Sequence, residues 1–346
     1  MVSSVPMTKA AGPLVAAQGP FFEQLAVGQV FDTAPSVALS NGHAVTHQAI
    51  VGDRLRLPPD DRLAAAVVGQ ESLVHPALVW DVAIGQSTLP THHVRANLFY
   101  RGFVFRRFPM IGDTLTTATE VVALRQNRPR PERRPTGLAV PRVSTVDQEH
   151  RPVLDFWRCA MLPLGDPAAD TGHRDDLDAV GVRPGPAEFA AAVAHWRLDL
   201  FRRQVRGGEH FTDIGVGRQW KVVGADVVSS APELARLTLN IATVHHDEIA
   251  AGGQRLVYGG HTIGLALAQV SRAIPNIVTV AGWDGCDHVG PVREGDSLAS
   301  TVTVESTEPL VTGGGLAWLR VEVDARAGPA GRLRPVLLWR CAVILS

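Results

Sequence analysis

The sequence has few cysteines, no excess of charge of either sign and no long apolar run. Its three cysteines, Cys159, Cys286 and Cys341, are odd in number and form no CxxC spacing, which argues against a disulfide framework and a zinc knuckle. The 33 basic and 34 acidic residues nearly cancel, so nothing indicates a surface for nucleic acid or an anionic membrane. The longest apolar runs are shorter than the roughly 18 to 20 residues that span a bilayer. We therefore expect a cytoplasmic protein without a nucleic-acid or membrane partner.

Length and composition are those of a globular protein with two domains. The chain has 346 residues, of which 45% are hydrophobic and 19% charged, which lies outside the composition of disordered chains. Such a length exceeds one typical domain. Residues 1–20 hold one lysine and a short, interrupted apolar stretch, and we interpret them as a flexible tail and not as a signal sequence.

Four sequence segments occur twice, in the same order. The pairs are residues 21–28 with 211–217, 74–86 with 257–269, 112–115 with 295–298, and 153–160 with 336–342. The offsets are 189 (217 − 28), 183 (257 − 74), 183 (295 − 112) and 182 (339 − 157). Conserved order and nearly constant spacing indicate an internal duplication.

Each half is predicted to hold one buried helix and several long strands. The helix follows residue 74 in the first half and residue 257 in the second, and has few charges, so it should be buried on most sides. Alternating stretches such as 114–123 and 317–324 predict strands. A helix wrapped by an antiparallel sheet is the expected packing, which is an α+β fold. We place the units at residues 21–164 and 209–346, with a linker over 165–208 that contains one helical stretch.

A polar cluster in the second half has the composition of an active site. Asn240, His245 and Asp247 lie close together in sequence and precede the pair Gly259-Gly260 at the predicted helix start. Histidine moves protons near neutral pH, and free N–H groups at a helix start stabilise developing negative charge. Glycine allows a substrate to approach the backbone closely. The combination suits addition of water to a double bond conjugated to a carbonyl, or the reverse elimination, whereas the ligand spacing of a metal site is missing.

Several nearby polar residues have two interpretations. His246 is expected to support its neighbour or to lie at the surface, and His261 to be a core histidine or a site residue. The pair Asp287-His288 could be structural or line a pocket. The basic, proline-rich residues 125–135 predict a solvated hairpin tip, with a contact to ligand phosphates as the functional alternative.

At these residues the sequence resembles the MaoC-like, or R-specific, enoyl-CoA hydratases of the hotdog superfamily. Their motif reads Asp-x-Asn-Pro-x-His-x-Asp, followed by a His-Gly-Met segment that opens the hotdog helix. The resemblance places Asn240 at the catalytic Asp, His245 at the catalytic His and Gly260 at the glycine whose N–H is the oxyanion donor. It implies a tandem double hotdog, a hydratase or dehydratase of acyl-CoA thioesters that needs no cofactor, and a homodimer. The residues expected to bind substrate are Tyr258, Asp247, Gly259 and His261.

The sequence also departs from this motif. Asn240 lacks the carboxylate of the family's Asp, and Thr243 replaces the proline. The Asn form and the two-unit length look like the mesaconyl-CoA (2-methylfumaryl-CoA) hydratase branch, which implies reversible hydration of mesaconyl-CoA to β-methylmalyl-CoA. Two alternatives are a non-catalytic protein that binds acyl-CoA or acyl-carrier protein, and a hotdog thioesterase.

The first half carries a changed copy of the motif. Asp53 matches Asn240 (240 − 53 = 187), but Pro58 stands where His245 is expected (245 − 58 = 187). Pro76-Ala77 replaces the Gly-Gly step. Because proline cannot exchange protons, we expect this unit to be non-catalytic and to widen the acyl pocket.

Overall fold

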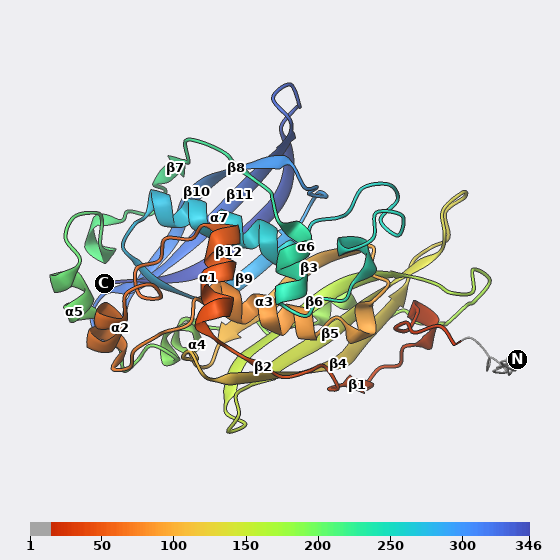
Figure 1. Cartoon of the computed structure of the whole chain (residues 1–346), viewed down its shortest axis with the longest axis horizontal. Helices are drawn as coiled ribbons and strands as arrows, with labels where there is room; N and C mark the ends of the chain where they lie inside the picture. Colours follow the sequence, from red (N-terminus) through yellow and green to blue (C-terminus); the bar gives the residue numbers. More distant parts are fainter. Residues whose placement is uncertain (1–14) are drawn as a thin grey trace, which may run out of the picture.

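The computed structural model describes residues 15–346, which form one large sheet with α1, α3, α6 and α7 on one of its faces (Figure 1). Residues 1–14 of the expected tail lie outside the described part. The strands are β1 Val30–Phe31, β2 Val37–Ala38, β3 Ala96–Phe105, β4 Thr114–Gln126, β5 Thr136–Val146, β6 Pro152–Pro163, β7 Gln219–Lys221, β8 Asp226–Val227, β9 Ile277–His288, β10 Asp296–Pro309, β11 Gly315–Ala327 and β12 Arg334–Leu345.

The helices are short apart from three that pack on the sheet or on each other. The α-helices are α1 Asn41–Val51, α2 Asp61–Val68, α3 Pro76–Gln86, α4 Pro186–Ala191, α5 Leu198–Gln204, α6 Ala231–Leu237 and α7 Gly259–Ala273. The 3₁₀ turns are η1 Phe22–Gln24, η2 Leu89–Thr91, η3 Leu177–Ala179, η4 Phe211–Asp213 and η5 Thr243–His245. None of the described helices is long and apolar enough to cross a bilayer.

The strand order shows the duplication directly. The sheet runs β1-β4-β5-β6-β3-β9-β12-β11-β10-β7, with β2 beside β4 and β8 beside β10. The four long strands of each repeat are neighbours, and the repeats join where β3 pairs antiparallel with β9, from Phe99 opposite Asp287 to Val104 opposite Gly282. The expected α+β architecture of two helix-and-sheet units is confirmed.

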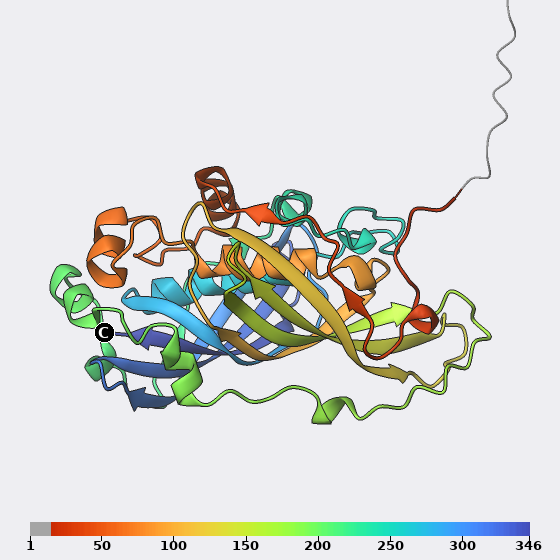
Figure 2. The same ribbon diagram turned by 90° about the horizontal axis from the view of Figure 1, so that it is seen from below.

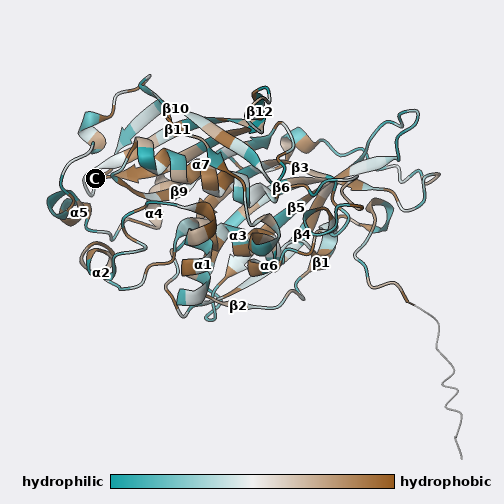
Figure 3. Cartoon of the chain, turned by 45° about the horizontal axis from the view of Figure 1, so that its top comes forward, coloured by the Kyte–Doolittle hydropathy of each residue, from teal (hydrophilic) through white to brown (hydrophobic). Residues whose placement is uncertain are grey.

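The two central helices lie next to each other in the concave side of this sheet. Every residue of α3 is buried, and α7 is buried from Gly260 to Ser271, in agreement with the low charge of both segments. Figure 2 shows both helices inside the curved sheet, and Figure 3 shows hydrophobic residues along them and mainly hydrophilic loops around the outside. Burial of these apolar side chains is the main stabilising contribution of both units.

A cluster of aromatic side chains fills the interior near the junction of the units. The rings of Phe103 and Trp283 stack at a centroid distance of 3.8 Å, and Trp80 meets Trp283 edge to face at 5.0 Å. Such pairs contribute about 0.5–1.5 kcal/mol each beyond their burial. The repeats therefore share one core, and they do not form two cores that merely touch.

The segment between the repeats crosses the face of the sheet opposite α3 and α7 (Figure 2). It holds η3, α4 and α5, and its side chains Phe189 and Trp196 are buried. The Trp196 ring lies 5.0 Å from that of Phe108, which attaches the segment to the first unit. Residues 125–135 form the tip between β4 and β5 and contribute no side chain to the cavity described below.

Candidate active site

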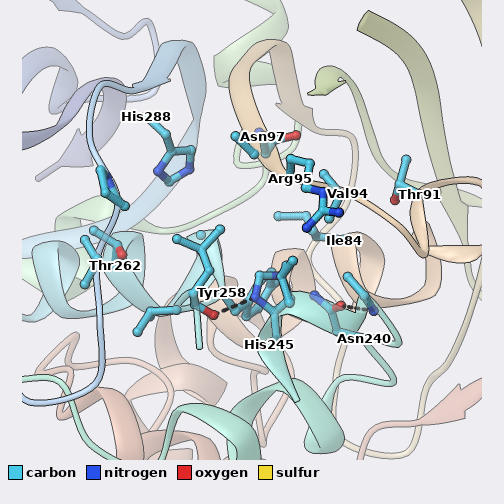
Figure 4. A pocket seen from close by; sticks show the side chains of 18 of the residues that line it. Ile84, Thr91, Val94, Arg95, Asn97, Asn240, His245, Tyr258, Thr262 and His288 are labelled. Atoms are coloured by element: carbon cyan, nitrogen blue, oxygen red, sulfur yellow. Dashed lines mark hydrogen bonds between the residues drawn. The ribbon is translucent and has the colours of Figure 1, made fainter. Parts of the chain in front are cut away.

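A cavity of about 340 Å³ lies between the two units. Its wall comes from α3, η2, β3 and β6 of the first unit, and from residues 240–258, the start of α7 and the end of β9 of the second. Figure 4 shows His245 and Asn240 on one side of the cavity and His288 and Asn97 on the other. No aspartate or glutamate lines this cavity in the part of the chain that the structure describes.

His245 is held in a single orientation. It ends the 3₁₀ turn η5, which is attached to the first unit because Thr243 N–H donates to the His92 carbonyl at 3.0 Å. The ring nitrogen Nδ1 lies 2.8 Å from the carbonyl oxygen of Leu256, an acceptor only, so Nδ1 carries the proton. Nε2 is then unprotonated in the neutral ring. Burial lowers the pKa of His245 to about 4, and the charges of His246 and Arg158 act in the same direction. The ring is therefore a neutral base at physiological pH.

Asn240 presents its amide nitrogen to the cavity. Its Oδ1 accepts from the N–H of Ala242 at 3.0 Å, which determines the orientation of the amide group and leaves the NH₂ group on the other side. Asn240 can therefore donate hydrogen bonds but cannot take up a proton. His246 Nε2 donates to the Asn240 carbonyl at 2.6 Å, so His246 supports Asn240 and does not line the cavity.

The start of α7 forms another part of the wall. Gly259 lines the cavity, and a Cβ there would lie 2.8 Å from His288 Nε2. Gly260 instead faces α3, where a Cβ would collide with Asp81 Oδ1. The N–H groups of the first residues of a helix have no partner within it and lie at its positive end. The backbone here can therefore bind an oxyanion, and the bare backbone next to the cavity belongs to Gly259.

The other predicted site residues have different places. Tyr258 lines the cavity, but its hydroxyl donates to the Asp81 carbonyl at 3.1 Å. Asp247 is exposed and accepts from Ile249 N–H at 2.8 Å, which closes a turn. His261 is completely buried outside the cavity wall. The structure thus brings Asn240, His245, Tyr258 and Gly259 together and leaves Asp247, Gly260 and His261 outside the wall.

His288 belongs to the cavity, whereas its neighbour Asp287 is exposed. Burial lowers the pKa of His288 to about 4, and within residues 15–346 its Nε2 has no hydrogen-bond partner. The sequence left open whether this pair is structural or lines a pocket. Because His288 lies at the end of β9, beside the start of α7, it lines the pocket.

Comparison with known proteins identifies the relatives of this arrangement. No family model matches the chain. A structure of a conserved hypothetical protein of Mycobacterium tuberculosis, described as essential for survival during infection and as a double hotdog, is 52% identical. It covers 95% of this chain and 99% of its own, with a TM-score of 0.88. A MaoC domain protein of Chloroflexus aurantiacus has the same fold, with a TM-score of 0.79 at 23% identity over 94% and 97% of the chains.

The chain belongs to the same double-hotdog family as the Mycobacterium tuberculosis protein.

Two curated relatives of this double-hotdog protein have names that describe enzymes. The β-methylmalyl-CoA dehydratase of Chloroflexus aurantiacus is 27% identical over 293 residues, which are 81% of this chain and 80% of that protein. The mesaconyl-CoA hydratase of Cereibacter sphaeroides is 27% identical over 318 residues, or 88% of each chain.

Among the cavity residues of this double hotdog that sequence reasoning missed is Arg158, on β6. The residue is only 3% exposed. Its guanidinium donates to the Ser87 carbonyl at 2.7 Å, to Ser87 Oγ at 3.1 Å and to Thr91 Oγ1 at 2.8 Å. The repeat contained a signal for it. The Val-to-Trp spacing is four residues in the first copy (157 − 153) and three in the second (339 − 336), and one extra residue in a strand turns the following side chains to the other face.

The pseudo-symmetric place in the double hotdog also holds a cavity, of about 300 Å³, lined by Asp53, Pro58 and His75, and here the proline takes the place of the histidine base. The offset of 183 relates Tyr100 to Trp283 and Phe105 to His288, so two aromatic side chains of the core stand where the counterparts of cavity residues would be. Asp53, the counterpart of Asn240, is fully bonded. It accepts from His75 Nε2 and from Ser271 Oγ at 3.1 Å. His75 Nδ1 in turn accepts from Ala77 N–H at 3.0 Å, so this histidine caps α3 and has no free nitrogen.

Proposed function

We propose that this protein is a hydro-lyase that reversibly adds water to a trans-2-enoyl-CoA thioester, with mesaconyl-CoA as the first candidate substrate and β-methylmalyl-CoA as its product. The observation that carries the proposal is His245, a buried neutral imidazole whose Nδ1 donates to the Leu256 carbonyl and whose Nε2 is unprotonated. The names of the two curated relatives support the reaction class and the acyl group.

Each polar group of the cavity can carry out one step of the reaction. The Asn240 amide donates to a water molecule and directs its lone pair toward C3 of the enoyl group. His245 Nε2 takes the proton of that water as the C3–O bond forms. The negative charge that develops on the thioester oxygen is stabilised by the free N–H groups at the start of α7, at Gly259 or Gly260. The imidazolium then gives its proton to C2, which completes the addition of water.

This mechanism needs only proton transfer and hydrogen bonds, so we propose that no cofactor takes part. The homodimer and the cytoplasmic location predicted from the sequence also remain proposals. Light scattering of the purified chain tests the first of these, because a homodimer has twice the 37.0 kDa mass of one chain.

The test follows the absorbance of the conjugated thioester while mesaconyl-CoA or crotonyl-CoA is incubated with the protein. We expect the variant His245→Ala to lower kcat by about 10²–10⁴-fold, the usual contribution of a positioned acid or base, while acyl-CoA binding is retained. His195→Ala is the matched control, because His195 is exposed on the linker.

Three outcomes separate the alternatives. Loss of double-bond absorbance without release of free thiol identifies a hydratase. Release of free CoA with the double bond intact identifies a thioesterase. Tight binding with no turnover of any short unsaturated thioester, and with no effect of His245→Ala, identifies a binding protein and refutes the proposal.

A further inference from the structure

The cavity contains a buried positive charge that the protein does not neutralise. Arg158 is 3% exposed, and burial lowers its pKa. Its three hydrogen bonds go to neutral oxygens, of Ser87 and Thr91. It forms no ion pair within residues 15–346, and its Nη1 makes no hydrogen bond there, since the three bonds use Nε and Nη2. Other partly buried arginines do have acidic partners, such as Arg107 with Asp147 and Arg334 with Asp296.

An unpaired buried charge is unfavourable, because the low-dielectric interior replaces the water that solvated it. The neutral acceptors of Ser87 and Thr91 hold the plane of the guanidinium in place without cancelling its charge. A guanidinium with one edge fixed and another edge free matches the two oxygens of a carboxylate. The positive charge of Arg158 is therefore neutralised only when an anionic group enters the cavity.

The rest of the wall points to the same kind of ligand. Arg95 and Arg293 also line the cavity, and each binds a backbone carbonyl, of Ala250 and Gln254 respectively. Both are more exposed than Arg158, so Arg158 is the buried charge of the three. Nothing acidic from the described residues faces it across this cavity.

The repeat shows that this position is specific to the cavity. The equivalent arginine in the second copy, Arg340, projects from the other face of its strand and pairs with Glu305 at 3.2 Å. The sequence Trp-Arg-Cys is the same in both copies. Only the one-residue difference earlier in the same strand places Arg158 inside.

We propose that Arg158, a residue of the unit without the catalytic motif, binds a free carboxylate on the acyl group of the thioester and thereby determines the preference for carboxylated enoyl substrates. This inference rests on the proposed function. It goes beyond it because it assigns substrate recognition to one residue and predicts that any acyl group with a carboxylate at its far end is recognised.

The experiment compares fumaryl-CoA with crotonyl-CoA, which differ only in a terminal carboxylate against a methyl group. We expect the wild-type protein to favour fumaryl-CoA in kcat/KM by about 10²-fold or more, since sites that bind a polar group reject analogues without it. Arg158→Gln, which keeps an amide donor for Ser87 and removes the charge, should abolish most of this preference by lowering the fumaryl-CoA value. Arg158→Lys should keep part of it. Arg340→Gln is the matched control and should leave the ratio unchanged.

Two results would overturn the inference. If Arg158→Gln lowers kcat/KM for both thioesters equally, the residue only supports the structure of the cavity. If the ratio does not change, the carboxylate is bound elsewhere. Thermal unfolding of each variant shows whether it is folded, and Arg158→Lys supplies the comparison if the glutamine variant is not.

Binding of saturated analogues separates this inference from the proposed function. Succinyl-CoA and butyryl-CoA cannot be hydrated, and their affinities are measured by calorimetry. Tighter binding of succinyl-CoA that is lost in Arg158→Gln supports the role of Arg158 even if no substrate turns over. Equal affinities of the wild-type protein for the two analogues refute that role whatever the hydratase activity.

Discussion

His261 offers a direct test of how this fold tolerates a buried polar side chain. It lies in the middle of the core on α7, completely buried, and neither ring nitrogen has a hydrogen-bond partner within residues 15–346. At the matching position of α3 the chain has Leu78, also completely buried (261 − 183 = 78). The variant His261→Leu therefore places in the second unit the residue that the first unit already uses.

The expected change in stability follows from the unpaired nitrogens. A buried donor or acceptor without a partner costs about 1–3 kcal/mol, and leucine has similar volume without polar atoms. We expect the free energy of unfolding at pH 7.5 to rise by roughly 1–3 kcal/mol, measured by urea denaturation. The reciprocal variant Leu78→His should lower it by a similar amount.

The pH dependence gives a second measurement. Burial lowers the pKa of His261 to about 4, whereas an unfolded histidine titrates near 6.5. Below pH 6.5 the unfolded chain binds a proton that the folded chain does not, so the fold loses stability as the pH falls from about 6.5 to about 4. One such group accounts for a loss on the order of 3 kcal/mol. His261→Leu should remove this share and flatten the stability profile over that range.

Hydratase activity should remain within about threefold of wild type, because His261 does not line the cavity and a substitution away from the reacting groups has little effect on the transition state. Lower stability at pH 7.5, or a loss of activity of tenfold or more, would contradict the reasoning and restore the interpretation of His261 as a site residue.

Two further predictions concern the reacting groups. His245 must be neutral to accept a proton, and its pKa is lowered to about 4. Activity should therefore stay nearly constant from pH 8 to about pH 5 and fall only below pH 5. A decline centred near pH 6.5 in short assays on folded protein would show that this residue is not the base. The variant Asn240→Asp introduces a carboxylate beside that imidazole, and the carboxylate stabilises the protonated form of the imidazole. The decline in activity should therefore move to higher pH, as measured by the same pH–rate profile. An unchanged profile would place Asn240 out of contact with the base.

Much of this architecture could be predicted from the sequence because it depends on local pattern. The repeat offsets indicated two units, and the uncharged segments after residues 74 and 257 indicated the buried helices α3 and α7. Pro58, at the place of the histidine, predicted that the first copy of the motif does not transfer protons. These properties depend on residue type and spacing along the chain, which the sequence states directly.

The composition of the cavity depended on contacts between distant segments. Which glycine faces the cavity was decided by the packing of α7 on α3, where Gly260 lies against Asp81 and leaves Gly259 at the wall. The orientation of Asn240 was decided by the N–H of Ala242 and by His246. Neither could be read from the motif, because the motif defines residue types and not the directions of their hydrogen bonds.

The sequence by itself thus determined that the chain is a duplicated α+β protein in which one copy of the motif has a histidine and the other a proline. Only the tertiary structure decided that the Arg158 side chain lies in the cavity and the Arg340 side chain on the exposed face of the sheet, although both stand in the same Trp-Arg-Cys sequence. The physical reason is the two-residue period of a strand. A side chain's face depends on the register of the whole strand in the sheet, and that register is set only when β6 and β12 have paired with their neighbours.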